Sequence, residues 1–171
     1  RLALPEILDY GAEQTRPPTV QDIVNLCRIA EALPAVDAVF KCDCAIADVP
    51  EEMNDIIAVA TALSNTGKLQ LCIPISLNSA RVWAEIAELA TQSGDLNKEP
   101  IIMTEVSTTS PLQLDEQSAR VLLYMCGKGV PMATLPMPMS GGTAPYTLAG
   151  TMVMQNAEAL FLITLAQLVR P

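Results

Sequence analysis

Apolar runs and amphipathic segments alternate along this chain, and that alternation constrains its fold more than any other feature. Apolar runs at residues 35–43, 68–76, 100–107 and 130–137 predict β-strands. A segment with helical spacing follows each run, at residues 51–65, 78–91, 115–127 and 146–169, and another at residues 19–33 precedes the first. No hairpin turn such as Asn-Gly joins two of the runs. Strands that alternate with helices in this way predict a parallel sheet with crossover helices.

Polar residues mark where several of these helices begin. Thr19 with Asp22 three residues later has the spacing of a capping pair. Asn78 and Asp115 are predicted to cap two later helices. The helix that Asp115 starts is expected to end at one of two glycines, Gly127 or Gly129.

Two architectures fit this order: an open doubly wound sheet, or part of an eight-fold (β/α) barrel. A dinucleotide-binding doubly wound fold has a glycine-rich turn directly after its first strand. Here the corresponding stretch reads "KCDCAIADVP" and contains no glycine. We therefore expect a partial α/β barrel of the TIM type over residues 19–171, preceded by an irregular segment over residues 1–18. Four strand–helix units are half of such a barrel, so we expect the chain to be part of a longer protein.

The composition fits a folded protein and excludes several classes of partner. Half of the 171 residues are hydrophobic and only 17% are charged, as in a folded protein. A chain of this length can form one domain with a hydrophobic core. The net charge is −9 and no run of Lys or Arg occurs, whereas nucleic acids and anionic membrane surfaces need basic patches. The five cysteines are scattered through apolar segments and no signal peptide is visible, so we expect reduced thiols and a cytoplasmic protein.

The apolar stretch over residues 147–169 is long enough for a membrane span. Polar residues interrupt it, namely Gln155, Asn156, Glu158 and Gln167, and no Lys or Arg precedes its start. We therefore predict a buried core helix and no membrane partner.

In a parallel barrel the active site lies at the carboxyl ends of the strands, and this rule selects the candidate residues. They are Cys42, Asp43 and Cys44 after the first strand, Ser76 and Asn78 after the second, Glu105, Ser107, Thr108 and Thr109 at the third, and residues 137–143 after the fourth. Cys42 and Cys44 would lie on one face of a strand, but their spacing is narrow for zinc and the chain has no histidine. We predict ordinary buried cysteines and no metal, and the missing histidine excludes Ser-His and Cys-His triads within this segment.

Glu105 lies inside an apolar strand, where an unpaired carboxylate is costly to bury. Either it faces a cation or a protonated group at the mouth of the barrel, or it pairs with a neighbouring Lys or Arg. The residues alone leave both possibilities open.

The loop "PMPMSGGTAPYTLAG" at residues 136–150 also has two interpretations. Backbone N–H groups of a glycine-rich loop before a helix can bind a phosphate or a carboxylate. Alternatively, the glycines only permit a tight turn between strand and helix.

The same loop carries a resemblance to the trimethylamine methyltransferase family of corrinoid-dependent enzymes. The similar pieces are "APYTLAG" (144–150), "NAE" (156–158), "LAQL" (165–168), "TRPPT" (15–19), "ALPAVD" (32–37), "DVPEE" (48–52) and "TSPLQLDEQ" (109–117). They occur in the family's order along almost the whole chain. The chain departs from the common pattern at Gln14, where a histidine is frequent, and at "SGGTAP", where "AGATAP" is common.

The resemblance implies a (β/α)8 barrel enzyme that moves a methyl group from a tertiary or quaternary amine to the cobalt of a corrinoid (cobalamin). That corrinoid is carried by a separate partner protein, and no cofactor is implied to bind this chain directly. Glu105 becomes the candidate catalytic residue. The residues implied to contact substrate or corrinoid are Met139, Ser140, Gly141, Gly142, Thr143 and Tyr146. We also expect a homo-oligomer. Some members use pyrrolysine, at a position downstream of this chain, whereas many lack it and are implied to act on quaternary amines such as glycine betaine. We expect a member of this second, quaternary-amine type, although the resemblance does not identify the amine.

Two alternatives stay open. One is a different barrel enzyme that binds an anionic or phosphate-bearing substrate at the glycine loop. The other is an inactive barrel fragment whose exposed sheet edge and apolar faces drive dimerisation.

Overall fold

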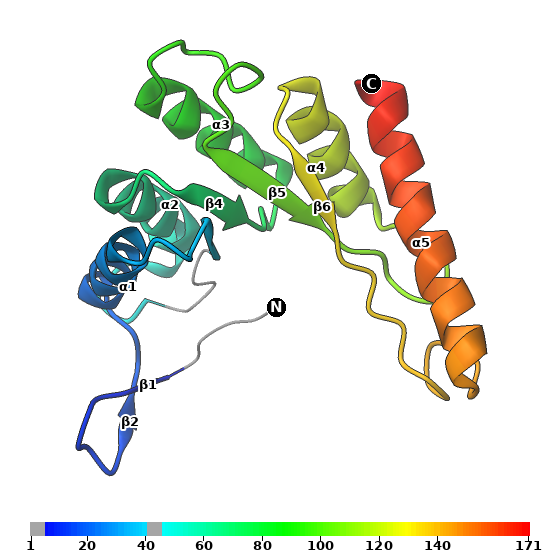
Figure 1. Cartoon of the computed structure of the whole chain (residues 1–171), viewed down its shortest axis with the longest axis horizontal. Coiled ribbons are helices and arrows are strands. Elements are labelled where there is room, and N and C mark those ends of the chain that lie inside the picture. The colour runs from blue at the N-terminus through cyan, green and yellow to red at the C-terminus, as the bar shows by residue number, and fades with distance from the viewer. Residues whose placement is uncertain (1–5, 41–45) are drawn as a thin grey trace.

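A computed structural model of the chain describes residues 6–40 and 46–171 (Figure 1). Its main sheet has four parallel strands, β3 (Ala38–Phe40), β4 (Leu69–Cys72), β5 (Ile102–Val106) and β6 (Met132–Thr134). The helices are α1 (Val20–Ala32), α2 (Asn54–Asn65), α3 (Leu77–Ala90), α4 (Glu116–Gly127) and α5 (Leu148–Val169), with a 3-10 turn, η1 (Glu51–Met53), before α2. The predicted alternation of parallel strands and helices is confirmed.

The strands lie side by side in the order in which they occur in the sequence, β3-β4-β5-β6. Each helix from α1 to α5 packs against the next one, and Figure 1 shows them in a row along one side of the sheet. A doubly wound sheet instead reverses its strand order and carries helices on both faces. Over the described residues the sheet therefore has neither the reversed strand order nor the second helix layer of a doubly wound fold. Over the described residues the sheet is open, with β3 and β6 at its edges.

Side chains alternate between the two faces of the sheet, as strand geometry requires. On β5, Ile102 and Val106 belong to the buried clusters that the strands form with the helices. Met103 and Glu105 consequently point to the face that carries no helices. The face with helices holds the largest core cluster, which surrounds Trp83 of α3.

The N-terminal segment, expected to be irregular, contains a small antiparallel hairpin of β1 (Ile7–Leu8) and β2 (Thr15–Arg16). Gly11 has a φ of 78° in its turn, a conformation that glycine adopts without a steric penalty. In Figure 1 the hairpin projects away from the sheet and the helices.

The structure confirms two of the predicted caps and corrects a third. Thr19 donates to Asp22 Oδ2 through its N–H at 2.7 Å and its hydroxyl at 2.8 Å, and Asp115 accepts the Ser118 N–H at 2.9 Å. The prediction for Asn78 is wrong. Ser76 caps α3 instead, because its hydroxyl accepts the Ser79 N–H at 3.0 Å and the helix begins before Asn78.

Gly129 ends the helix that Asp115 starts. It follows α4 with a φ of 81°, and its N–H donates to the carbonyl of Cys126 at 2.9 Å. This left-handed residue after the last turn is the usual glycine stop signal of a helix. Gly127 lies within α4 itself.

Asp22→Asn is expected to lower the free energy of unfolding at pH 7 by about 1 kcal/mol, because it weakens the cap of α1. Arg16 donates two hydrogen bonds of 2.8 Å to the Asp22 carboxylate. These bonds hold the pKa of Asp22 well below its ordinary value, although partial burial acts in the opposite direction. A lowered pKa stabilises the fold above the pKa of the unfolded chain, about 4, and this contribution disappears as pH falls toward the folded value.

Urea unfolding of both chains between pH 7 and pH 2 measures this effect. The difference in the free energy of unfolding between wild type and Asp22→Asn should decrease as the pH falls below about 4. Glu13→Gln, a change at an exposed carboxylate of the hairpin, is the control. A gap that stays constant down to pH 2 would exclude ionised Asp22 as the cause.

Helix α5 differs from the predicted buried core helix. Its buried side chains are Thr151, Glu158 and Leu162, whereas many large apolar side chains are exposed. The described elements that pack closely on it are α4 and β6, which cover one side of the helix. Among the described helices α5 alone has the length and apolar composition of a membrane span, a property that core helices of soluble proteins share.

Candidate active site

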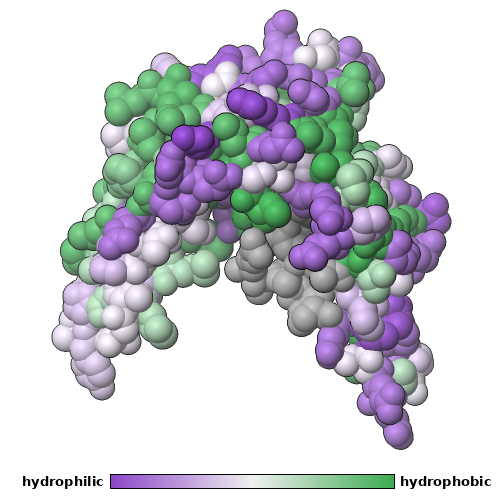
Figure 2. All heavy atoms as spheres, turned by 180° about the vertical axis from the view of Figure 1, so that it is seen from behind, coloured by the Kyte–Doolittle hydropathy of each residue, from purple (hydrophilic) through white to green (hydrophobic). Residues whose placement is uncertain are grey.

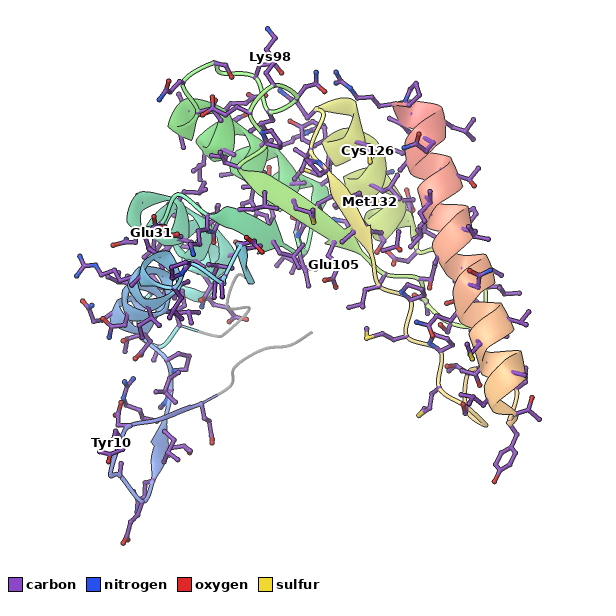
Figure 3. The ribbon with its side chains drawn as sticks, viewed as in Figure 1. Tyr10, Glu31, Lys98, Glu105, Cys126 and Met132 are labelled. Carbon is purple, nitrogen blue, oxygen red and sulfur yellow. The ribbon has the colours of Figure 1, made fainter. Side chains whose placement is uncertain are left out.

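Glu105 lies near the carboxyl end of β5, on the face of the sheet without helices, and is only 7% exposed. Figure 3 shows it at the carboxyl end of β5, directed away from the helices. Its register partner on β6 is Ala133. A carboxylate in this position can interact with a cation that approaches the carboxyl ends of the strands.

The rest of this sheet face is apolar near Glu105. Leu71 of β4 is in register with Met103 of β5, and both are partly buried. The low polarity of these neighbours strengthens any electrostatic interaction that Glu105 makes. Among the described residues of this sheet face, Glu105 is therefore an acidic group with apolar neighbours.

The loop that follows β5 is attached to α5 through Glu158. This carboxylate is 1% exposed and accepts hydrogen bonds from Thr108 Oγ1 at 2.7 Å, Ser110 Oγ at 2.8 Å and the Leu112 N–H at 2.8 Å. Burial raises the pKa of the Glu158 carboxyl, but these hydrogen bonds outweigh it and bring the pKa below its ordinary value. Thr108, predicted as a site residue, is thus used to hold its own loop.

Glu158 was not among the site residues predicted from the sequence. The same signal that selected Glu105, a lone carboxylate within an apolar segment, applies to Glu158 in the middle of α5. Its partners are 46 to 50 residues away in the chain, so the sequence offered no indication of which groups it contacts.

The glycine loop between β6 and α5 is a compact turn closed by its own hydrogen bonds. The N–H groups of Gly142, Thr143 and Ala144 all donate to the Met139 carbonyl, at 2.9 to 3.0 Å. The Gly141 N–H donates to the Ala144 carbonyl at 3.0 Å, and the Met139 N–H to Thr143 Oγ1 at 2.9 Å. Since these donors are already used within the loop, its geometry disfavours the anion-binding interpretation.

The glycines of this loop also allow close packing of larger side chains. Gly141 has a φ of 75°, and a Cβ there would lie 3.3 Å from the Tyr146 ring. A Cβ at Gly142 would lie 2.9 Å from Met139 Cε. Met139 and Tyr146 are 64% and 89% exposed, so the loop presents a thioether and an aromatic ring to solvent.

The structure brings the predicted loop residues together, while Glu105 comes from the sheet itself. Figure 1 shows the loop running from the end of β6 along the N-terminal half of α5. Viewed from the opposite side, the molecule is hollowed between this arm and the arm of the β1–β2 hairpin (Figure 2). Figure 3 shows Glu105 at the end of the sheet that lies between these two arms.

Two further candidates have structural partners, and three lie outside the described residues. Ser76 caps α3, and the backbone of Thr109 pairs with Gln113. The prediction for Cys42, Asp43 and Cys44 falls on residues that the structure does not describe. Within residues 6–40 and 46–171, no three His, Cys, Asp or Glu side chains gather as a metal site would require.

A pocket of about 260 Å³ lies at the opposite end of the strands. Its lining includes Val130 and Pro131 before β6, Asn97, and Arg170 after α5. Ligands of parallel α/β proteins bind at the carboxyl ends of the strands, so we do not place the active site in this pocket.

Comparison with known proteins identifies relatives along the whole chain. A family model described as trimethylamine methyltransferase matches residues 2–171. Trimethylamine methyltransferase MttB of Desulfitobacterium hafniense (strain DSM 10664 / DCB-2) is 30% identical over 167 residues, which are 95% of this chain and 33% of the relative. The Methanosarcina thermophila protein of that name is 32% identical over 154 residues, 88% of this chain and 32% of the relative.

A glycine betaine methyltransferase of Desulfitobacterium hafniense (strain Y51) is 27% identical over 157 residues, 91% of this chain and 33% of the relative. The chain thus spans about a third of the length of the curated relatives that it matches.

Proposed function

Because the chain belongs to the trimethylamine methyltransferase family, we propose that the protein containing it transfers a methyl group from a methylated amine to a corrinoid. The methyl carbon leaves the amine nitrogen, which keeps the bonding electron pair, and bonds to the reduced cobalt of the corrinoid. That corrinoid belongs to a separate partner protein and acts as the methyl acceptor. This chain therefore has to bind and orient the amine.

The observation that carries the proposal is the buried carboxylate of Glu105 among apolar side chains at the end of a parallel strand. A quaternary ammonium is a permanent cation, and a protonated tertiary amine is a cation too. Either one fits a site that combines a carboxylate with apolar surface for its methyl groups. We assign Glu105 the role of holding this cation.

We further propose that the four-stranded sheet is part of a (β/α)8 barrel completed by residues outside this chain. The sequential strand order and the single row of helices support this proposal. So does the apolar face of the sheet, because alternate side chains of barrel strands fill the interior. The open edges at β3 and β6 are where further strands would pair.

The glycine loop is proposed to border the entrance through which the corrinoid reaches the amine. Met139 and Tyr146 are exposed there, and both offer apolar surface to a large planar group. Ser140, Gly141, Gly142 and Thr143 shape the turn that presents them. We propose a cytoplasmic homo-oligomer as the working form of the enzyme.

Glu105→Gln in the whole protein is expected to weaken binding of the methylated amine by about 10- to 100-fold, since a buried charge partner of the cation is lost. Calorimetric titration with trimethylamine and with glycine betaine measures this affinity. Glu116→Gln, at an exposed carboxylate on α4, is the matched control and should leave it unchanged.

Two outcomes would contradict the proposal in different ways. Equal affinity in wild type and Glu105→Gln would remove Glu105 from the site. A wild-type protein that transfers no methyl group from any methylated amine to a reduced corrinoid protein would refute the proposed activity itself.

A further inference from the structure

The buried side of α5 carries two polar residues at positions where an apolar side chain would be expected. Thr151, Glu158 and Leu162 are buried, and their spacings of seven and four residues place them on one side of the helix. Leu162 packs with Val106, Leu122 and Cys126 in a core cluster. Thr151 instead lies in the first turn of α5, which follows the glycine loop, and Glu158 lies in the middle of the helix.

Each of these polar residues contacts a different loop. Glu158 accepts three hydrogen bonds from the loop after β5, at 2.7 to 2.8 Å, as described above. Thr151 Oγ1 lies 2.6 Å from Ser140 Oγ and 2.9 Å from the Pro145 carbonyl, both in the loop after β6. One helix face thus holds the loops that leave the carboxyl ends of two neighbouring strands.

We infer that Glu158 is a positioning residue for methyl transfer, which works with Thr151 to keep the β5 loop and the β6 loop in a fixed relation. The inference rests on the proposed function, because these loops border the proposed site. Glu105 is three residues before Thr108, so displacement of the β5 loop moves the strand end that carries the proposed cation-binding group.

The chemistry of the contact explains why a carboxylate serves here. Its two oxygens accept from two hydroxyls and one backbone N–H together. Leucine at this position would remove the acceptor of all three partly buried donors. Glutamine can replace much of the network, since its carbonyl accepts the Leu112 N–H while the hydroxyls rotate to accept from its amide group.

The test compares Glu158→Leu and Glu158→Gln in the whole protein with Gln155→Leu, the same kind of change at an exposed position of α5. Amide hydrogen exchange over residues 107–113 measures how firmly the β5 loop is held. Steady-state kinetics with the amine and the corrinoid protein measure the effect of the loop on methyl transfer. Glu158→Leu should raise exchange in this loop and lower kcat by about 10²-fold, with a smaller change in KM for the amine. Glu158→Gln should restore most of kcat, and Gln155→Leu should match wild type.

If Glu158→Leu does not fold, the double variant Thr108→Val, Ser110→Ala removes two donors and leaves the helix intact. The same rise in exchange and fall in kcat is then expected. Unchanged exchange over residues 107–113 in the folded variant would overturn the inference. So would raised exchange with wild-type kcat well below the melting temperature, because the contact would then serve stability alone. Absence of methyl transfer in wild type would refute the proposed function, whereas the exchange measurement would still decide whether Glu158 holds the loop.

Discussion

Trp83→Ala is expected to lower the free energy of unfolding by about 3–5 kcal/mol, the usual cost of removing a fully buried large aromatic side chain. Trp83 is 0% exposed and belongs to a cluster with Val59 of α2, Cys72 of β4, Ile102 of β5 and Met125 of α4. Truncation leaves a cavity where three helices meet the sheet. These elements cannot all close over it, because their positions are set by the strand pairing.

Urea unfolding of wild type and variant measures this loss. Leu89→Ala, in the same helix, is the matched control because Leu89 is 87% exposed. It should change stability by less than about 0.5 kcal/mol. A loss below about 1 kcal/mol for Trp83→Ala would mean that the core around α3 is not packed as described.

Gly129→Ala is expected to destabilise the fold by about 2–4 kcal/mol, because two unfavourable effects combine at this position. The φ of 81° is one that alanine adopts only with strain. In addition, the new Cβ would lie 2.7 Å from Asn97 Cβ and 3.0 Å from Asn97 Cα. The Asn97 backbone would have to move, which costs more than a change of side-chain rotamer.

Two other glycines separate these effects in the same unfolding experiment. Gly94 has a φ of 65° but no atom within 4 Å of an added Cβ, so Gly94→Ala should cost only the backbone strain, about 1–2 kcal/mol. Gly67 has neither constraint, and Gly67→Ala should lie within about 0.5 kcal/mol of wild type. Equal losses for Gly129→Ala and Gly94→Ala would show that contact with Asn97 has no effect.

The sequence was most informative where local chemistry decides the structure. Apolar runs became parallel strands, although shorter ones, and Thr19 and Asp115 cap their helices because a cap involves groups only three residues apart. The wrong prediction for Asn78 is also local, since the observed cap lies only two residues away. Ser76 and Asn78 can both cap, and the choice depends on where the chain leaves β4.

Patterns that depend on distant partners were predicted less well. The composition of α5 fits a buried core helix, yet the described elements cover only one side of it. The glycine loop has the composition of an anion site, but its N–H groups donate to the loop's own carbonyl oxygens. Composition does not report which acceptors lie within reach of a donor.

The candidate site shows the same difference between what local sequence predicts and what depends on distant residues. Glu105 was selected from the sequence, because a carboxylate in an apolar strand is unusual whatever surrounds it. Glu158 has an equally unusual setting, but its role became visible only with Thr108, Ser110 and Leu112 placed around it.

Local preference and hydrophobic periodicity in this sequence are sufficient for the order of strands and helices, the parallel sheet, and the strand end where Glu105 lies. The family could be inferred from short motifs for the same reason, since a motif is a local pattern. The single row of helices, the closed glycine loop and the attachment of two loops to α5 depend on contacts between residues far apart in the chain. Such contacts form only when the elements pack, so they belong to the tertiary structure.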